Sequence, residues 1–131
     1  MADLFSPAWM ARFVEEWNKD PELSDALAQI GFNSVIAYGY PEEEKPRAFL
    51  VVQNGKATAS GVYTDQPLNW DIRAQHPQWL KWIEKSPGMT GLGMAFTTGK
   101  IKFKVGDYAS MLKDPRMAGP FVKSFSAMSK I

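Results

Sequence analysis

The spacing of hydrophobic residues changes twice along this chain, from a helical period to a strand period and back. Two amphipathic helices are predicted first, after Ser6-Pro7 and after Asp20-Pro21, because each pair combines an N-cap residue with a proline. The apolar residues that recur at helical spacing are Trp9, Met10, Phe13, Val14, Trp17, Leu23, Ala26, Leu27 and Ile30. The chain therefore opens with two helices that each have one apolar face to bury.

Residues 34–74 follow a strand period instead. Strands are predicted over 34–40, 48–53 and 56–63, and Asn54-Gly55 favours a two-residue hairpin turn between the last two. A fourth strand is predicted over 69–74, where Trp70, Ile72 and Ala74 alternate with Asn69, Asp71 and Arg73. Such alternation is typical of a sheet with one packed face and one solvated face, so we expect an antiparallel meander.

The helical period then returns. Helices are predicted after His76-Pro77, after Ser86-Pro87, after Gly106-Asp107 and from Pro120. One further strand, over 99–105, interrupts them, with three lysines alternating with apolar residues: Lys100, Lys102 and Lys104 against Ile101, Phe103 and Val105. Helices at both ends of a mainly antiparallel sheet define an α+β architecture.

Length and composition narrow the class of protein. The 131 residues are expected to form one domain, 1–131. The net charge is only +1, which argues against a nucleic-acid partner. The chain has no cysteine, no apolar run of the roughly 18 residues that a membrane span needs, and no signal-peptide pattern at its start. We therefore expect a cytoplasmic protein without disulfides.

The motifs of common catalytic sites are missing. The single histidine, His76, and the absence of cysteine argue against a metal site, and no nucleophile elbow is present. The glycine-rich segment 88–100 fails the phosphate-loop pattern, since Met94 and Ile101 stand where Gly and Ser or Thr are required. We therefore expect no catalytic residues, no metal and no cofactor.

The lysine strand allows two interpretations. Its three lysines could bind nucleic acid or anionic lipid, or they could simply solvate the outer face of an edge strand. The second interpretation is favoured, because Phe103 points away from the lysines and gives no stacking platform beside them.

The segment 95–107 resembles the C-terminal signature of the sterol carrier protein 2 family. Its matching positions are Ala95, Phe96, Gly99, Lys100 and Lys102, followed by Gly106-Asp107 and an apolar helix. Val105 is an apparent extra residue in that pattern. The resemblance implies an α+β domain with a five-stranded, mainly antiparallel sheet, covered by helices and enclosing an apolar tunnel. Members of the family bind and carry sterols, fatty acids or acyl-CoAs without catalysis.

The resemblance also implies which residues would line the ligand site, namely apolar residues of the later helices and of the lysine strand. They are Trp79, Trp82, Ile83, Met89, Leu92, Phe96, Phe103, Met111, Phe121, Phe125 and Met128. The expected function is non-catalytic binding and carriage of a lipid, with a partner enzyme or a transient membrane contact as further partners.

Two other functions stay open at this point. One is an interaction module that presents substrate to a separate lipid-metabolising enzyme, which predicts a filled core and an exposed aromatic patch. The other is a small enzyme, whose acid–base groups would have to come from Tyr38, Tyr63, His76, Tyr108 and Asp107.

Overall fold

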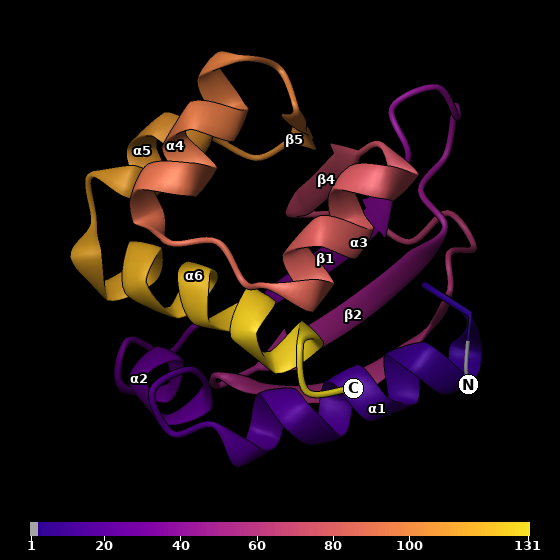
Figure 1. The fold of residues 1–131 in the computed structure, drawn as a ribbon. Helices are drawn as coiled ribbons and strands as arrows, with labels where there is room; N and C mark the ends of the chain where they lie inside the picture. The colour runs from indigo at the N-terminus through magenta and orange to yellow at the C-terminus, as the bar shows by residue number, and fades with distance from the viewer. Residues whose placement is uncertain (1–2) are drawn as a thin grey trace.

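A computed structural model describes residues 3–131 as a five-stranded sheet covered by helices (Figure 1). The strands are β1 (Ser34–Gly39), β2 (Ala48–Gln53), β3 (Lys56–Val62), β4 (Trp70–Ala74) and β5 (Ile101–Val105). The helices are α1 (Pro7–Lys19), α2 (Ser24–Gln29), α3 (His76–Glu84), α4 (Met89–Thr97), α5 (Tyr108–Leu112) and α6 (Pro115–Met128). The predicted α+β class is confirmed, and the predicted strands agree within two residues.

The order of strands in the sheet is β3-β2-β1-β4-β5. All neighbours are antiparallel except β1 and β4, which run parallel, so the expectation of a simple meander is wrong at β4. The β2–β3 hairpin forms as predicted, with positive φ at both Asn54 and Gly55. The burial of the strands agrees with this order: β4 is buried along most of its length and lies inside the sheet, whereas the more exposed β3 lies at one edge.

The helices pack together around α6. Helix α6, yellow in Figure 1, contacts each of the other five helices, and α1 lies along β2 and β3. Two tryptophans attach helices to the sheet through buried hydrogen bonds. The Nε1–H of Trp17 donates to the carbonyl of Gly55, and the Nε1–H of Trp79 donates to the carbonyl of Gly39. Their indole rings bury a large apolar area at the same time.

Three helix starts differ from the sequence-based expectation. Helix α6 begins at Pro115, where the Asp114 side chain caps it, and Pro120 lies inside the helix instead of starting it. The missing N–H of Pro120 would have met the carbonyl of Arg116, an exposed residue of the first turn. Helix α2 starts at Ser24, after a turn that follows Asp20, and the N-cap of α4 is Gly88.

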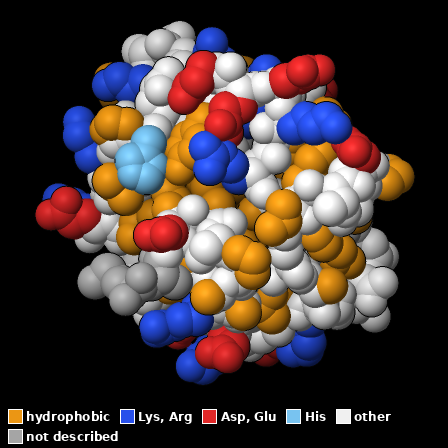
Figure 2. Space-filling view, turned by 90° about the vertical axis from the view of Figure 1, so that its right-hand side faces the viewer, with side chains coloured by type: hydrophobic (Ala, Val, Ile, Leu, Met, Phe, Trp, Pro, Cys, Tyr) orange, Lys and Arg blue, Asp and Glu red, His pale blue; other side chains and the backbone are white. Residues whose placement is uncertain are grey.

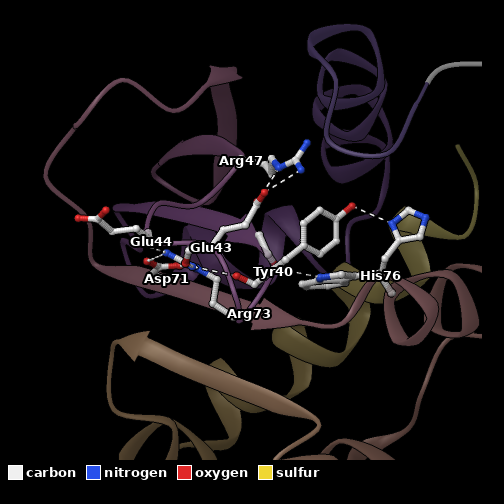
Figure 3. A network of polar contacts seen from close by, with 9 residues as sticks. Tyr40, Glu43, Glu44, Arg47, Asp71, Arg73 and His76 are labelled. Carbon is white, nitrogen blue, oxygen red and sulfur yellow. Dashed lines mark hydrogen bonds and ion pairs between the residues drawn. The ribbon is translucent and has the colours of Figure 1, made fainter.

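The alternation in residues 69–74 predicted that the second face of the sheet is solvated, and this prediction is wrong for part of that face. Asp71 and Arg73 are both buried, and the Arg73 guanidinium donates to both carboxylate oxygens of Asp71 at 2.6 and 2.9 Å. Arg73 also donates to the carbonyls of Tyr40, Glu43 and Glu44, which lie at or beyond the end of β1 (Figure 3). A charged strand residue could be buried because the polar loop 41–46 folds over it and satisfies its donors.

Candidate functional site

An apolar pocket lies between the helices and the sheet, with an empty volume of about 440 Å³ that includes its open side. The residues that line it are Trp17, Leu27, Phe32, Ile36, Tyr38, Trp70, Ile72, Met111, Met117, Pro120, Phe121 and Ser124. Nearly all of these side chains are hydrocarbon, aromatic or thioether groups. A lining of this composition is typical of sites that bind small hydrophobic molecules.

The periodicity of two element types brings these side chains together. In α6, Met117, Pro120, Phe121 and Ser124 stand at i, i+3, i+4 and i+7, so they share one face of the helix. In the sheet, alternate residues of β1 and β4 point to the same side. The pocket is therefore the space between one face of α6 and the centre of the sheet.

The pocket is narrow, since only a small part of its volume is wide enough for a water molecule. A ligand must therefore push side chains or helices apart as it enters. Two of the lining residues, Met111 and Met117, are unbranched and flexible, so they can repack around a ligand at low cost. The sequence resemblance implied an open tunnel, and a continuous tunnel stays a prediction.

A second, open hollow of mixed polarity adjoins the pocket and shares Phe32, Trp70, Met111 and Met117 with it. Its polar lining residues are Ser34, Asn69, Asp107, Ser110 and Asp114. Because the two spaces share a wall, we refer to the second one as the mouth of the pocket. The arrangement combines an apolar interior with an opening that also carries polar groups, which suits an amphipathic ligand.

Hydrogen bonds keep the two carboxylates of the mouth ionised. The side-chain hydroxyl and the backbone N–H of Ser110 lower the pKa of Asp107 below its ordinary value of 3.8. The side chain and backbone N–H of Arg116 do the same for the pKa of Asp114. Asp107 and Asp114 are also the N-caps of α5 and α6, so their orientation has a structural cause.

Only two of the ligand-lining residues expected from the sequence, Met111 and Phe121, line the pocket. Five others are buried in the main core: Trp79, Trp82, Leu92, Phe125 and Met128. Ile83 and Phe103 are partly buried, and Met89 and Phe96 are each 42% exposed on α4. The ligand contacts of these nine residues stay a prediction.

Sequence reasoning did not select most of the lining residues, among them the four strand residues Ile36, Tyr38, Trp70 and Ile72. These residues alternate with others along their strands, but the alternation indicated only that one face of the sheet is packed. The α6 stripe was read from Pro120 onward, so Met117, one turn earlier, was missed.

Helix α4 and the adjoining strand present an unusual surface. Four of the large hydrophobic residues exposed in the described chain lie there: Met89, Met94, Phe96 and Val105. The segment from Lys85 to Gly106 contains four lysines and no acidic residue. Lys102 and Lys104 are exposed on β5, as the alternation of that strand predicted.

The ionisable groups considered for catalysis lie in different places: Tyr38 lines the pocket, Asp107 lines the mouth, and neither space is lined by Tyr63, His76 or Tyr108. The Tyr40 hydroxyl and the His76 Nδ1 form a 2.8 Å hydrogen bond near the loop network, and neither residue lines the pocket (Figure 3). Figure 2 shows His76, the chain's single histidine, at the surface beside apolar side chains. Among residues 3–131, no group of three metal-ligating side chains lies together.

Tyr38 is the one acid–base candidate that lines the apolar pocket itself. Burial raises its pKa far above the ordinary value, so the hydroxyl stays protonated at neutral pH. In the same described part of the chain, no helix has the length and apolar character to cross a membrane.

Comparisons with solved structures show which known fold this chain has. A crystal structure of sterol carrier protein 2 matches 98% of this chain and 99% of its own, with a TM-score of 0.76 and 17% identity. The apo form of sterol carrier protein 2 from Yarrowia lipolytica matches 100% of this chain and 98% of its own, at a TM-score of 0.56 and 12% identity. The chain therefore has the fold of sterol carrier protein 2, as its C-terminal motif implied.

A third solved structure links this fold to a different process. It is described as UbiJ-SCP2, a ubiquinone synthesis protein, and matches 89% of this chain and 84% of its own at a TM-score of 0.56 and 12% identity. The sequence itself matches no family model and no curated protein.

Proposed function

We propose that this protein binds and carries a hydrophobic small molecule in the pocket between α6 and the sheet, without catalysing a reaction. The observation that carries the proposal is the lining of that pocket, which is almost wholly apolar and adjoins an open hollow of mixed polarity. Proteins with the same fold are named for the carriage of sterols, which supports a lipid as the ligand.

The hydrophobic effect is sufficient to hold such a ligand. Each methylene group removed from water contributes about 0.8 kcal/mol, so a chain of ten buried methylenes gains about 8 kcal/mol before the costs of association and of opening the pocket. Polar contacts are therefore needed for selectivity more than for affinity.

A non-catalytic role is supported by the lining of the pocket. Acid–base catalysis needs a group that can accept a proton near neutral pH. Tyr38 stays protonated because its pKa is raised, and hydrogen bonds lower the pKa of Asp107 and Asp114, which makes both carboxylates weaker bases than an ordinary aspartate. We propose no catalytic residue and no cofactor.

A carrier must also exchange its ligand with a membrane or a partner. We propose that α4 contacts an anionic membrane surface, because its exposed Met94 and Phe96 are apolar and its neighbouring segments carry only positive charge. A partner enzyme is the alternative, which the ubiquinone synthesis protein with this fold favours. Flotation with vesicles of phosphatidylcholine and phosphatidylglycerol distinguishes them, since the membrane proposal requires binding that Met94→Asp abolishes.

The carrier function is tested by solvent extraction and mass analysis of the purified protein. A lipid is expected in the extract at a substantial fraction of the protein concentration. The matched control is Met117→Arg, which places a charge against the pocket at a position that is only partly buried. A folded Met117→Arg variant that retains the same lipid, or a delipidated protein that rebinds none, contradicts the proposal.

A further inference from the structure

The pocket and its mouth contain no positively charged lining residue. Among the described residues that line either space, none is Lys, Arg or His, whereas Asp107 and Asp114 line the mouth. Two cations lie nearby without lining either space: Arg116 binds the Asp114 carboxylate at 3.2 Å, and Lys113 is exposed at the end of α5. An anionic ligand group in this space would meet carboxylates without a cation lining the site.

A tyrosine hydroxyl is buried without a hydrogen-bond partner in a side-chain cluster that adjoins this pocket. The hydroxyl oxygen of Tyr108 is the one buried side-chain polar atom in residues 3–131 that forms no hydrogen bond. Its ring packs against three phenylalanines, with centroids 4.4 Å from Phe96, 4.8 Å from Phe103 and 6.1 Å from Phe121. An unpaired buried hydroxyl is unfavourable, so the folded protein retains an unused donor and acceptor at this point.

The side chains that cover Tyr108 are also walls of the pocket. Met111 belongs to the same small cluster as Tyr108, and Trp70, Met117 and Phe121 pack against that cluster. All four residues line the pocket. A ligand that displaces some of these four side chains as it enters the narrow pocket would therefore reach the cluster that contains Tyr108.

We propose that the ligand is an uncharged lipid carrying a hydroxyl or carbonyl group, and that this group forms a hydrogen bond with the Tyr108 hydroxyl. The inference rests on the proposed carrier function and specifies its ligand class. At Tyr108, a carboxylate or a phosphate ester would have to be desolvated without a cation to pair with, which is costly; in the open mouth it would stay hydrated but lie beside Asp107 and Asp114. A hydroxyl or carbonyl group needs only the one hydrogen bond that Tyr108 offers. Fatty acids and acyl-CoAs, which the sequence resemblance had included, are therefore poor ligands on this proposal.

The charge preference is tested with three ligands of equal chain length: 1-dodecanol, dodecanoate and dodecanoyl-CoA. Binding is followed by tryptophan fluorescence, because Trp17 and Trp70 line the pocket. At about pH 8 the alcohol is expected to bind at least tenfold more tightly than either anion. Dodecanoate should gain affinity as the pH falls and its carboxylate becomes protonated, while the alcohol should not. An anion that binds as tightly as the alcohol overturns the proposal, whereas the binding of none of the three contradicts the carrier function itself.

The role of Tyr108 is tested with Tyr108→Phe. The variant should bind 1-dodecanol at least fivefold more weakly and bind dodecane unchanged, and the empty protein should be as stable as wild type or more so, because an unpaired hydroxyl has been removed. Tyr63→Phe is the control, since that hydroxyl donates to the Gln66 carbonyl in a loop that does not line the pocket. A loss of alcohol binding in Tyr38→Phe with none in Tyr108→Phe overturns the assignment of the anchor.

Discussion

Two phenylalanines one turn apart on α6 should differ in what their truncation impairs: folding stability for Phe125 and ligand binding for Phe121. Phe125 is 1% exposed and packs against three aromatic rings, at 5.4 Å from Trp82, 6.2 Å from Trp79 and 5.4 Å from Phe121. Phe121 is only partly buried and lines the pocket. Phe125→Ala should therefore lower the free energy of unfolding by about 3–5 kcal/mol, the usual cost of deleting a core phenylalanine.

Phe121→Ala should cost the empty protein less than Phe125→Ala, because part of the Phe121 ring already faces empty space. It should reduce the affinity for a bound lipid more than tenfold, or by more than about 1.4 kcal/mol, because it removes a wall of the site. The assays are urea unfolding of the delipidated proteins and a lipid titration at a temperature where both variants are folded. Equal losses of stability, together with unchanged lipid affinity in Phe121→Ala, would refute the division between core and pocket.

Three further predictions concern the elements around the site. Phe103→Asp should lower the free energy of unfolding by several kcal/mol, because it buries a charge among aromatic rings, while Lys102→Asp on the outer face of the same strand should change stability little. Equal urea midpoints of the two variants would contradict the assignment of Phe103 to the buried face. Arg73→Met should lower the free energy of unfolding by about 3–5 kcal/mol, because it leaves the Asp71 carboxylate buried and unpaired. In a double-mutant cycle, replacing both residues should lower it by less than the sum of the two single changes. Since the pKa of Asp107 is lowered in the folded protein, its carboxylate stabilises the fold at pH values above the ordinary pKa of 3.8 and loses that effect as the pH falls through the lower folded pKa. The stability advantage of wild type over Asp107→Ala should therefore shrink between about pH 5 and about pH 3. An advantage that does not depend on pH would argue against an ionised cap.

The order of the elements could be predicted because local chemistry specifies most of them. Asn54-Gly55 produced the hairpin, since both residues adopt the positive φ that this turn requires. Ser6-Pro7 began the first helix, with the Ser6 hydroxyl accepting a hydrogen bond from the Trp9 N–H. The alternation in residues 101–104 correctly separated buried Ile101 from exposed Lys102.

The pairing of β4 with β1 could not be read from the chain. Strand pairing is a contact between residues far apart in sequence, and the short link between β3 and β4 had favoured their pairing instead. The burial of Asp71 and Arg73 was missed for a related reason. Arg73 pairs with Asp71 and donates its remaining N–H groups to the carbonyls of residues 40, 43 and 44, and the sequence does not show where a backbone carbonyl will lie.

The sequence predicted an apolar site, but few of the residues that line it. The signature around Gly99 and Lys100 implied a fold, and the comparisons with solved structures agree with it. Helical stripes alone did not show which apolar residues would pack against one another and which would leave a gap. Phe125 and Phe121 belong to one stripe, yet only Phe121 borders the pocket, because the tryptophans of α3 fill the space around Phe125.

The methionine side chains allow the most direct test of where a ligand binds. Met111 and Met117 line the pocket, Met10 and Met128 are buried in the core, and Met94 is exposed on α4. The measurement is the methyl NMR spectrum of protein labelled with ¹³C at the methionine methyl groups, recorded while 1-dodecanol is added to the delipidated sample. The account predicts large shifts for Met111 and Met117 that saturate with the ligand, and small shifts for Met10 and Met128. Saturating shifts at Met94 with none at Met111 and Met117 would place the ligand outside the pocket and contradict the account.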